Sequence, residues 1–214
     1  DVLYGSGHRE AGSKNAGSLG LKTSTDGGRT WSLKATLDGS DFHNIATGYL
    51  SGAVYLLNEA SSAQLSEPGI YAKQATSEPW RRAAMQGLFG EVKAIAVHPS
   101  EPGTIVAGTP SGLYMSRNGG DTFVLISSMP SVFAVSFDRS GDAVWFGTYE
   151  RAAKLVRLDL KANFAVRELP VPPHQGDAIA HIAFDPSNEG EMAIATTLRN
   201  LFVSRNEGSN WVQL

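Results

Sequence analysis

A polar turn that closes on an aromatic residue occurs three times in this chain at matching offsets. The first copy is STDGGRTW at residues 24–31, and it is repeated as SRNGGDTF at 116–123 and SRNEGSNW at 204–211. Asp and Asn side chains hydrogen-bond to the backbone amides of a turn, and Gly accepts positive φ, so each copy predicts a hairpin between two strands. The repeated positions are Ser24, Asp26, Gly28, Thr30 and Trp31, then Ser116, Asn118, Gly120, Thr122 and Phe123, then Ser204, Asn206, Gly208 and Trp211.

Two weaker copies fill the long intervals between these turns. A strand-like run at 69–73 leads to Trp80, and another at 154–158 leads to Phe164. The closing aromatic residues then stand at positions 31, 80, 123, 164 and 211, so the repeating unit is about 45 residues long. A unit of that length is typical of one blade of a β-propeller.

The strand-like runs repeat together with the turns. Four short runs per unit, separated by Gly, Pro, Asn and Ser, predict a four-stranded antiparallel blade. We therefore expect an all-β protein, a β-propeller with about five visible blades that end near residues 37, 85, 128, 170 and 214. A β-sandwich is the competing architecture, but it does not predict the same succession of strands and turns five times.

The chain starts in the middle of a repeating unit. Residues 1–6 match the second strands of the other units, so the innermost strand of the first blade is absent from this sequence. An unpaired innermost edge would leave backbone donors and acceptors unsatisfied. We therefore expect a single propeller domain over residues 1–214 that lacks upstream blade material and forms part of a ring of six or seven blades. A five-bladed ring closed in an unusual way is the alternative.

The turn motif Ser-x-Asp-x-Gly-x-Thr-Trp resembles the Asp-box, also called the bacterial neuraminidase repeat. Residues 24–31 meet it in full, and the two later copies carry Asn118 and Asn206 in place of Asp. The resemblance implies a propeller of the sialidase-like and sortilin-like type, with the box between the third and fourth strands and away from the ligand-binding face. Families with this box include glycosidases, receptors and photosystem II assembly factors, so the likeness implies a fold rather than an activity.

A wider likeness covers most of the chain. GSGH, DFHNI and PSGLYMSRNGGDTF look like segments of bacterial exported proteins that are labelled glycosyl hydrolases. The likeness implies an extracytoplasmic location, as a periplasmic, lipoprotein or secreted protein. The turn itself is interpreted as a folding element, because Asp26 alone offers far fewer oxygen ligands than the six to eight that calcium takes.

The composition excludes several classes of function. The chain carries 18 Lys and Arg against 21 Asp and Glu, without a block of like charge, so we expect no nucleic-acid partner. No apolar run approaches the roughly 18 residues that span a bilayer, so we expect no membrane span. The absence of cysteine excludes disulfides and thiolate metal sites.

The face opposite the repeated turns is where we expect the functional residues. Loops before first strands and loops after second strands meet there, because the strands of a blade alternate in direction. The expected ligand-facing residues are His8, Arg9, His43, Lys93, Tyr149, Arg151 and His181. The acidic residues on the same face are Asp41, Glu91, Glu150 and Asp177.

Three histidines on this face are candidate ligands of a divalent metal. His43 and His181 each stand at the beginning of an innermost strand, and His8 ends a second strand in a neighbouring blade. Neutral imidazole and carboxylate bind zinc or copper, and Asp41 or Asp177 could supply the carboxylate. Hydrogen-bonded polar residues that line a water-filled channel are the alternative, so the sequence assigns no cofactor.

Glycosidase chemistry needs groups that the chain supplies only in part. A sialidase uses three arginines, a tyrosine and an acidic partner; Arg9, Arg151 and Arg199 are available, but the sequence has no Arg-Ile-Pro tripeptide. Other glycosidases place two carboxyl groups roughly 5 Å or roughly 6.5–9.5 Å apart. The candidate catalytic carboxylates are Asp41, Glu91, Glu150 and Asp177.

No complete catalytic set emerges from these residues. We therefore expect a non-catalytic binding or assembly propeller that engages a protein, glycan or metal partner with the face opposite the repeated turns. A glycoside hydrolase that uses carboxylates on the same face is the alternative.

Overall fold

The computed structural model describes residues 2–8, 18–34, 37, 39–73, 79–172, 176–188 and 190–214. The regular elements within these ranges are all β-strands, which form five antiparallel sheets. No helix in this part of the chain is long and apolar enough to cross a membrane.

The first sheet has three strands, and each of the other four sheets has four strands in chain order. The strands of the first two sheets are β1 (Leu3–Gly5), β2 (Lys22–Ser24) and β3 (Ser32–Leu33), then β4 (Phe42–Thr47), β5 (Val54–Asn58), β6 (Gly69–Lys73) and β7 (Arg81–Arg82). Those of the third and fourth sheets are β8 (Ala94–Val97), β9 (Ile105–Thr109), β10 (Gly112–Ser116) and β11 (Val124–Ser127), then β12 (Val132–Phe137), β13 (Ala143–Tyr149), β14 (Ala153–Asp159) and β15 (Ala165–Leu169). The last sheet contains β16 (Ile179–Phe184), β17 (Met192–Thr196), β18 (Leu201–Ser204) and β19 (Val212–Gln213).

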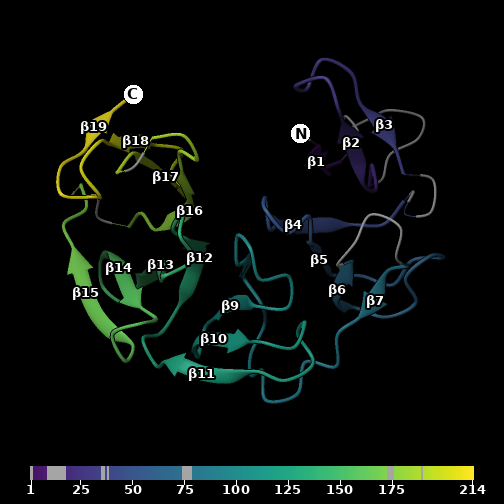
Figure 1. The fold of residues 1–214 in the computed structure, drawn as a ribbon, viewed down its shortest axis with the longest axis horizontal. Helices are drawn as coiled ribbons and strands as arrows, with labels where there is room; N and C mark the ends of the chain where they lie inside the picture. The colour runs from purple at the N-terminus through teal and green to yellow at the C-terminus, as the bar shows by residue number, and fades with distance from the viewer. Residues whose placement is uncertain are drawn as a thin grey trace.

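The five sheets follow one another around a ring (Figure 1). The innermost strands β4, β8, β12 and β16 contact each other in that order. An opening separates the last sheet from the first, and both ends of the chain flank it (Figure 1). The predicted fold class, an all-β propeller built from antiparallel blades, is confirmed, and we call the sheets blades 1 to 5 in chain order.

One apolar cluster fills each junction between consecutive blades. Leu21 and Leu56 pack between blades 1 and 2, Tyr55 and Ile105 between blades 2 and 3. Similar clusters join blade 3 to blade 4 and blade 4 to blade 5. Every residue of β5 and of β9 is buried. Because these second strands are covered on both faces, apolar residues follow one another in them without the alternation of a half-exposed strand.

The spacing of the blades depends on glycine in two second strands. A Cβ atom at Gly147 would lie 2.7 Å from the Cβ of Ile179, in the first strand of the next blade. A Cβ atom at Gly108 would lie 2.7 Å from Cγ1 of Val132, which is the equivalent contact one blade earlier. Any side chain at these positions would push the neighbouring blade away.

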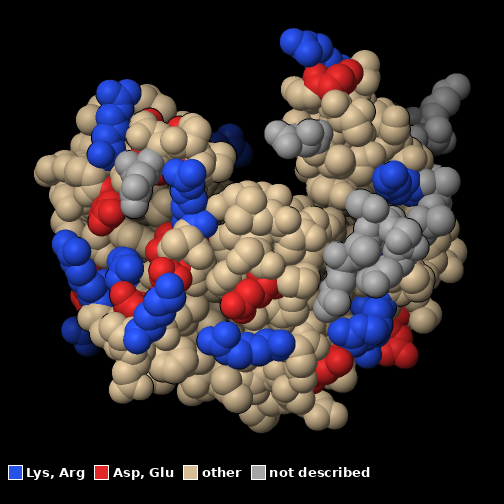
Figure 2. All heavy atoms as spheres, in the orientation of Figure 1, with Lys and Arg blue, Asp and Glu red and all other residues tan. Residues whose placement is uncertain are grey.

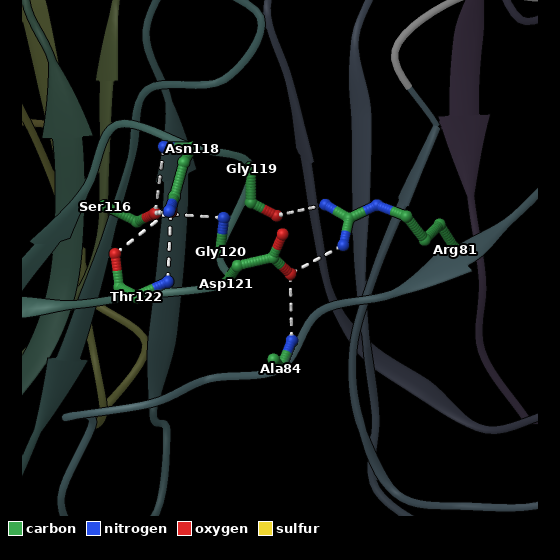
Figure 3. A network of polar contacts seen from close by, with 8 residues as sticks. All are labelled: Arg81, Ala84, Ser116, Asn118, Gly119, Gly120, Asp121 and Thr122. Carbon is green, nitrogen blue, oxygen red and sulfur yellow. Dashed lines mark hydrogen bonds and ion pairs between the residues drawn. The ribbon is translucent and has the colours of Figure 1, made fainter.

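The repeated turns connect the last two strands of blades 1, 3 and 5. In blade 1, β1, β2 and β3 correspond to the second, third and fourth strands of the other blades. In blade 1, the Gly28 amide donates to Ser24 Oγ at 2.9 Å, and the Thr30 amide donates to Asp26 Oδ1 at 2.9 Å. In blade 3, Asn118 Oδ1 accepts from the Thr122 amide at 3.0 Å (Figure 3). One acceptor oxygen forms the essential bond to the turn, so Asn can replace Asp there.

The closing aromatic residues differ in their burial. Phe123 is buried between blades 2 and 3, and Trp211 donates from Nε1 to the carbonyl of Pro170 in blade 4 at 2.8 Å. Trp31 remains 43% exposed and donates to Gly28 within its own turn at 3.0 Å. Trp31 is therefore less enclosed than Phe123, because no described blade precedes blade 1.

Candidate functional site on the loop face

The face opposite the repeated turns is formed by the connections that follow the second and fourth strands, and we call it the loop face. One residue at the start of three innermost strands bulges out of the strand pairing there. In blade 2 the register shifts between Phe42 and Asn44, and β12 and β16 carry the same shift. In blade 3 the pairing of β8 begins at Ala94, and Lys93 stands at the equivalent position just before it, where its amide donates to the Gly108 carbonyl. We call these four equivalent residues the bulge positions, and they are His43, Lys93, Phe133 and Ala180.

Two further positions surround each bulge. The pairing of each second strand with its third strand shows which residues of the five second strands are equivalent. In this alignment, one equivalent residue per blade lies where the chain leaves the second strand. We call these the exit positions, and they are His8, Glu59, Pro110, Tyr149 and Thr197. Two residues before each bulge stands Asp41, Glu91, Ser131 or Ala178. Side chains at bulges and strand ends point away from the sheet ladder, so these positions can vary without disturbing the blades.

Blades 1 and 2 bring two histidines and two carboxylates together on this face, and we call them the histidine cluster (His8, Asp41, His43 and Glu59). Asp41 Oδ1 lies 3.4 Å from His8 Nε2 and 3.1 Å from His43 Nε2. The other ring nitrogen of His43, Nδ1, lies 3.3 Å from Glu59 Oε2. The two imidazole rings meet edge to face, with centroids 5.6 Å apart.

Glu59 is the member of the histidine cluster that the sequence analysis missed. It directly follows β5, and its exit position is the one that His8 occupies in blade 1. This equivalence could have identified Glu59 from the sequence. The end of a second strand and the start of a first strand lie on the same face of a propeller, so Glu59 is expected on the face that carries His8 and His43.

Blade 3 carries a second acid and base pair at the corresponding positions. Lys93 Nζ lies 2.6 Å from Glu91 Oε2, just as His43 pairs with Asp41 in blade 2. A pocket of about 370 Å³ lies between blades 2 and 3 beside Glu91, and its lining includes Glu59, Glu91 and Val92. Blades 2 and 3 therefore each carry an acid and base pair at equivalent positions of the loop face.

Other predicted residues lie elsewhere on the loop face. His181 lies on β16, one residue beyond the bulge, and is not part of the histidine cluster. Tyr149 ends β13, and Glu150 and Arg151 form the exposed turn that follows it. Arg9 lies outside the residues that the structure describes.

The carboxylate of Asp177 is buried and hydrogen-bonded within the fold. It is 1% exposed, and it accepts hydrogen bonds from Thr197 Oγ1 at 2.8 Å, the Leu198 amide at 2.9 Å and Asn200 Nδ2 at 3.1 Å. Burial alone would raise the pKa of Asp177, but hydrogen bonds from Thr196, Leu198, Thr197 and Asn200 lower it to about 2. An ionised, enclosed carboxylate cannot supply the proton that a general acid donates.

The opposite face has larger pockets but different chemistry. Pockets of about 460 and 420 Å³ lie where the first strands end. Two carboxylates on that face accept hydrogen bonds within their own turns. Asp138 accepts from Ser140 Oγ at 2.9 Å, and Asp185 accepts from the Ser187 amide at 2.7 Å. Figure 2 shows basic and acidic side chains mixed over the face that it draws, with no patch of one sign.

No protein-family model matches this chain. Among curated proteins, a xyloglucanase from Hypocrea jecorina (strain QM6a) is 24% identical over an alignment that covers 65% of this chain and 21% of the xyloglucanase. The chain thus spans about a fifth of the length of the curated relative that it matches.

Solved structures share the propeller at low sequence identity. A nidogen/laminin complex matches with a TM-score of 0.71 and 13% identity, over 92% of this chain and 74% of that chain. The GH74 xyloglucanase from Xanthomonas campestris matches with a TM-score of 0.62 and 16% identity, over 100% of this chain and 36% of that chain. The extracellular domain of a hybrid two component system from B. thetaiotaomicron matches with a TM-score of 0.60 and 18% identity, over 93% of this chain and 25% of that chain. Identities this low establish the fold alone.

Proposed function

We propose that this chain is a non-catalytic binding propeller whose loop face engages a glycan or protein partner. One observation carries the proposal: five of the six described carboxylates in the connections of this face are already paired with a cation, an imidazole or a hydrogen-bond network. The five are Asp41, Glu59, Glu67, Glu91 and Asp177. Glu150 is the sixth. A glycosidase needs two carboxyl groups that face each other across a bond.

The histidine cluster also separates its two carboxylates. The imidazole of His43 lies between Asp41 and Glu59, with one ring nitrogen directed at each. The space that a sugar and a water would need between two catalytic carboxyl groups is filled by this ring. The variation among the bulge and exit positions, on blades that otherwise repeat, is the pattern of a binding surface on a rigid scaffold.

The resemblance of the repeated turns to the Asp-box supports the same proposal. The hydrogen bonds of Ser24 and Asp26 stay within the turn, and Ser116 and Asn118 repeat them. We propose that these turns are Asp boxes and stabilise the blades without contacting a ligand. An extracytoplasmic location is likewise a proposal, supported by the likeness to a domain whose name describes it as extracellular.

A glycoside hydrolase is the second candidate function. The likeness to a xyloglucanase favours it, and Glu150 is the described carboxylate on the loop face that has neither an ionic partner nor a hydrogen bond in the structure. The alternative therefore requires that a second carboxylate is released from its present partner when substrate binds.

Binding to a panel of immobilised glycans that includes xyloglucan tests the proposal. Lys93→Ala and Tyr149→Ala, both on the loop face, should weaken binding by roughly fivefold or more, equivalent to about 1 kcal/mol. Arg117→Ala removes an exposed charge within a repeated turn, on the face opposite the loop face, and should leave binding unchanged. If Arg117→Ala weakened glycan binding and the two loop-face variants left it unchanged, the binding surface would lie on the other side of the ring.

A further inference from the structure

We infer that His8, Asp41 and His43 form a binding site for a zinc ion at the junction of blades 1 and 2. One ligand atom from each of these three residues lies within 4.8 Å of the other two. The inference goes beyond the proposed function, because it concerns an ion that the chain would bind without any glycan or protein partner.

The spacing of the ligand atoms fits tetrahedral zinc. Zinc binds imidazole nitrogen and carboxylate oxygen at about 2.0–2.2 Å, so neighbouring corners of its tetrahedron lie about 3.3–3.5 Å apart. The two separations to Asp41 Oδ1 are 3.4 Å from His8 Nε2 and 3.1 Å from His43 Nε2. Small side-chain rotations would therefore place an ion at bonding distance from all three residues.

Glu59 orients one of the ligands. Its Oε2 lies 3.3 Å from Nδ1 of His43, on the side of the ring away from Asp41. A proton on Nδ1 would donate to Glu59 and leave Nε2 free to bind the metal. Carboxylates in this second layer around a zinc site fix the tautomer of a histidine ligand and raise its basicity. We assign Glu59 as a positioning residue.

The backbone holds the ligands on separate, well-defined segments. His43 occupies the bulge of β4, and Asp41 stands two residues before it. His8 comes from blade 1, where it forms an isolated antiparallel bridge with Ser18. Because its ligands come from two blades, a bound ion would link blade 1 to blade 2.

The site would keep one coordination position open. The side chains of His8 and His43 are 57% and 47% exposed, and that of Asp41 is 28% exposed. Three protein ligands with a solvent-facing fourth position are typical of zinc sites that bind water or an incoming ligand. Magnesium and calcium prefer sites made only of oxygen, so two imidazoles select against them.

Calorimetric titration of the metal-stripped protein with zinc tests this inference. We expect one zinc ion per chain for the unmodified protein, with affinity at least tenfold weaker in His8→Ala and His43→Ala. Glu59→Gln should weaken binding by about tenfold to a hundredfold without changing the stoichiometry. His181→Ala is the matched control, because it removes an exposed histidine on the loop face outside the histidine cluster, and it should bind zinc as the unmodified protein does.

Thermal melting of each variant without metal checks that it folds, and His8→Gln and His43→Gln replace any alanine variant that does not. At the same zinc concentration, the melting temperature of the unmodified protein and of His181→Ala should rise by more than that of the His43 variant. The absence of zinc uptake by the unmodified protein would overturn the inference. Full uptake by the folded His43 variant would overturn it too, as would an equal loss in His181→Ala or equally tight binding of magnesium.

Discussion

Arg81 of blade 2 and Asp121 of blade 3 form an ion pair between neighbouring blades, with Arg81 Nη1 2.6 Å from Asp121 Oδ1 (Figure 3). The same guanidinium donates from Nη2 to the carbonyl of Gly119 at 3.2 Å, and the amide of Ala84 donates to the same carboxylate at 3.1 Å. The chain that leaves blade 2 is thus attached to the repeated turn of blade 3.

We expect Asp121→Ala to lower the free energy of unfolding by about 1 kcal/mol. The pair is more than a third exposed, so solvent screens it, and the lost bond to the Ala84 amide adds to the small ionic contribution. Urea denaturation measures the change. Arg117→Ala is the control, since Arg117 is 60% exposed and lies 3.8 Å from Glu101. Equal stability of Asp121→Ala and the unmodified protein would show that this contact does not stabilise the junction.

The carboxylate of Asp26 should make part of the stability depend on acid. Hydrogen bonds from the side chain and amide of Thr30, and then from Ser24, lower the pKa of Asp26 to about 2. Its pKa in the unfolded chain is about 3.9, so its contribution is present above about pH 4 and is lost as the pH falls toward 2.

Asp26→Asn should keep the turn and remove this acid dependence, because Asn118 makes the equivalent bonds in blade 3. Thermal melting at neutral pH and at about pH 2.5 compares the variant with the unmodified protein. The loss of melting temperature on acidification should be smaller in the variant. An identical loss in both proteins would contradict the role given to this carboxylate.

Asp177 should behave as a structural residue. Asp177→Ala leaves the Leu198 amide and the Asn200 side chain without their acceptor, which should cost about 1–3 kcal/mol in the free energy of unfolding. Glu150→Gln, in an exposed turn of the same face, should change it by less than about 0.5 kcal/mol. Chemical denaturation of both variants measures this difference. A stable Asp177→Ala variant that had lost ligand binding would instead assign Asp177 to the binding site.

Gly147 should tolerate no side chain. Gly147→Ala would bring a methyl group against Ile179 of the next blade and should destabilise the protein by about 1–3 kcal/mol. Gly7→Ala is the matched control, because no heavy atom outside its chain neighbours lies within 4 Å of a Cβ placed there. Comparable melting temperatures for the two variants would contradict the proposed limit on blade spacing.

The blades could be predicted from the sequence because their chemistry is local. A turn such as that of Ser116 and Asn118 closes within a few residues, so its pattern of Ser, Asn, Gly and aromatic is visible in one short segment. The predicted face also holds His8, Asp41 and His43, since strand direction alone determines which loops share a face.

The contacts between blades could not be predicted in the same way. His8 meets Asp41 across a blade junction, and spacing along the chain carries no information about that distance. His43 and His181 both begin innermost strands, but only His43 is the bulged residue, so the register puts them at different positions. Asp177 matched the pattern of an accessible carboxylate, whereas the hairpin between β17 and β18 encloses it.

Release of reducing ends from the glycan panel, including xyloglucan, tests the central claim most directly. A folded sample of the chain should bind through its loop face and release no more reducing sugar than a protein-free control. The claim would be contradicted if the chain released reducing sugar and Glu150→Gln abolished this release while the variant still folded and bound the glycan. That result would identify the chain as a glycoside hydrolase.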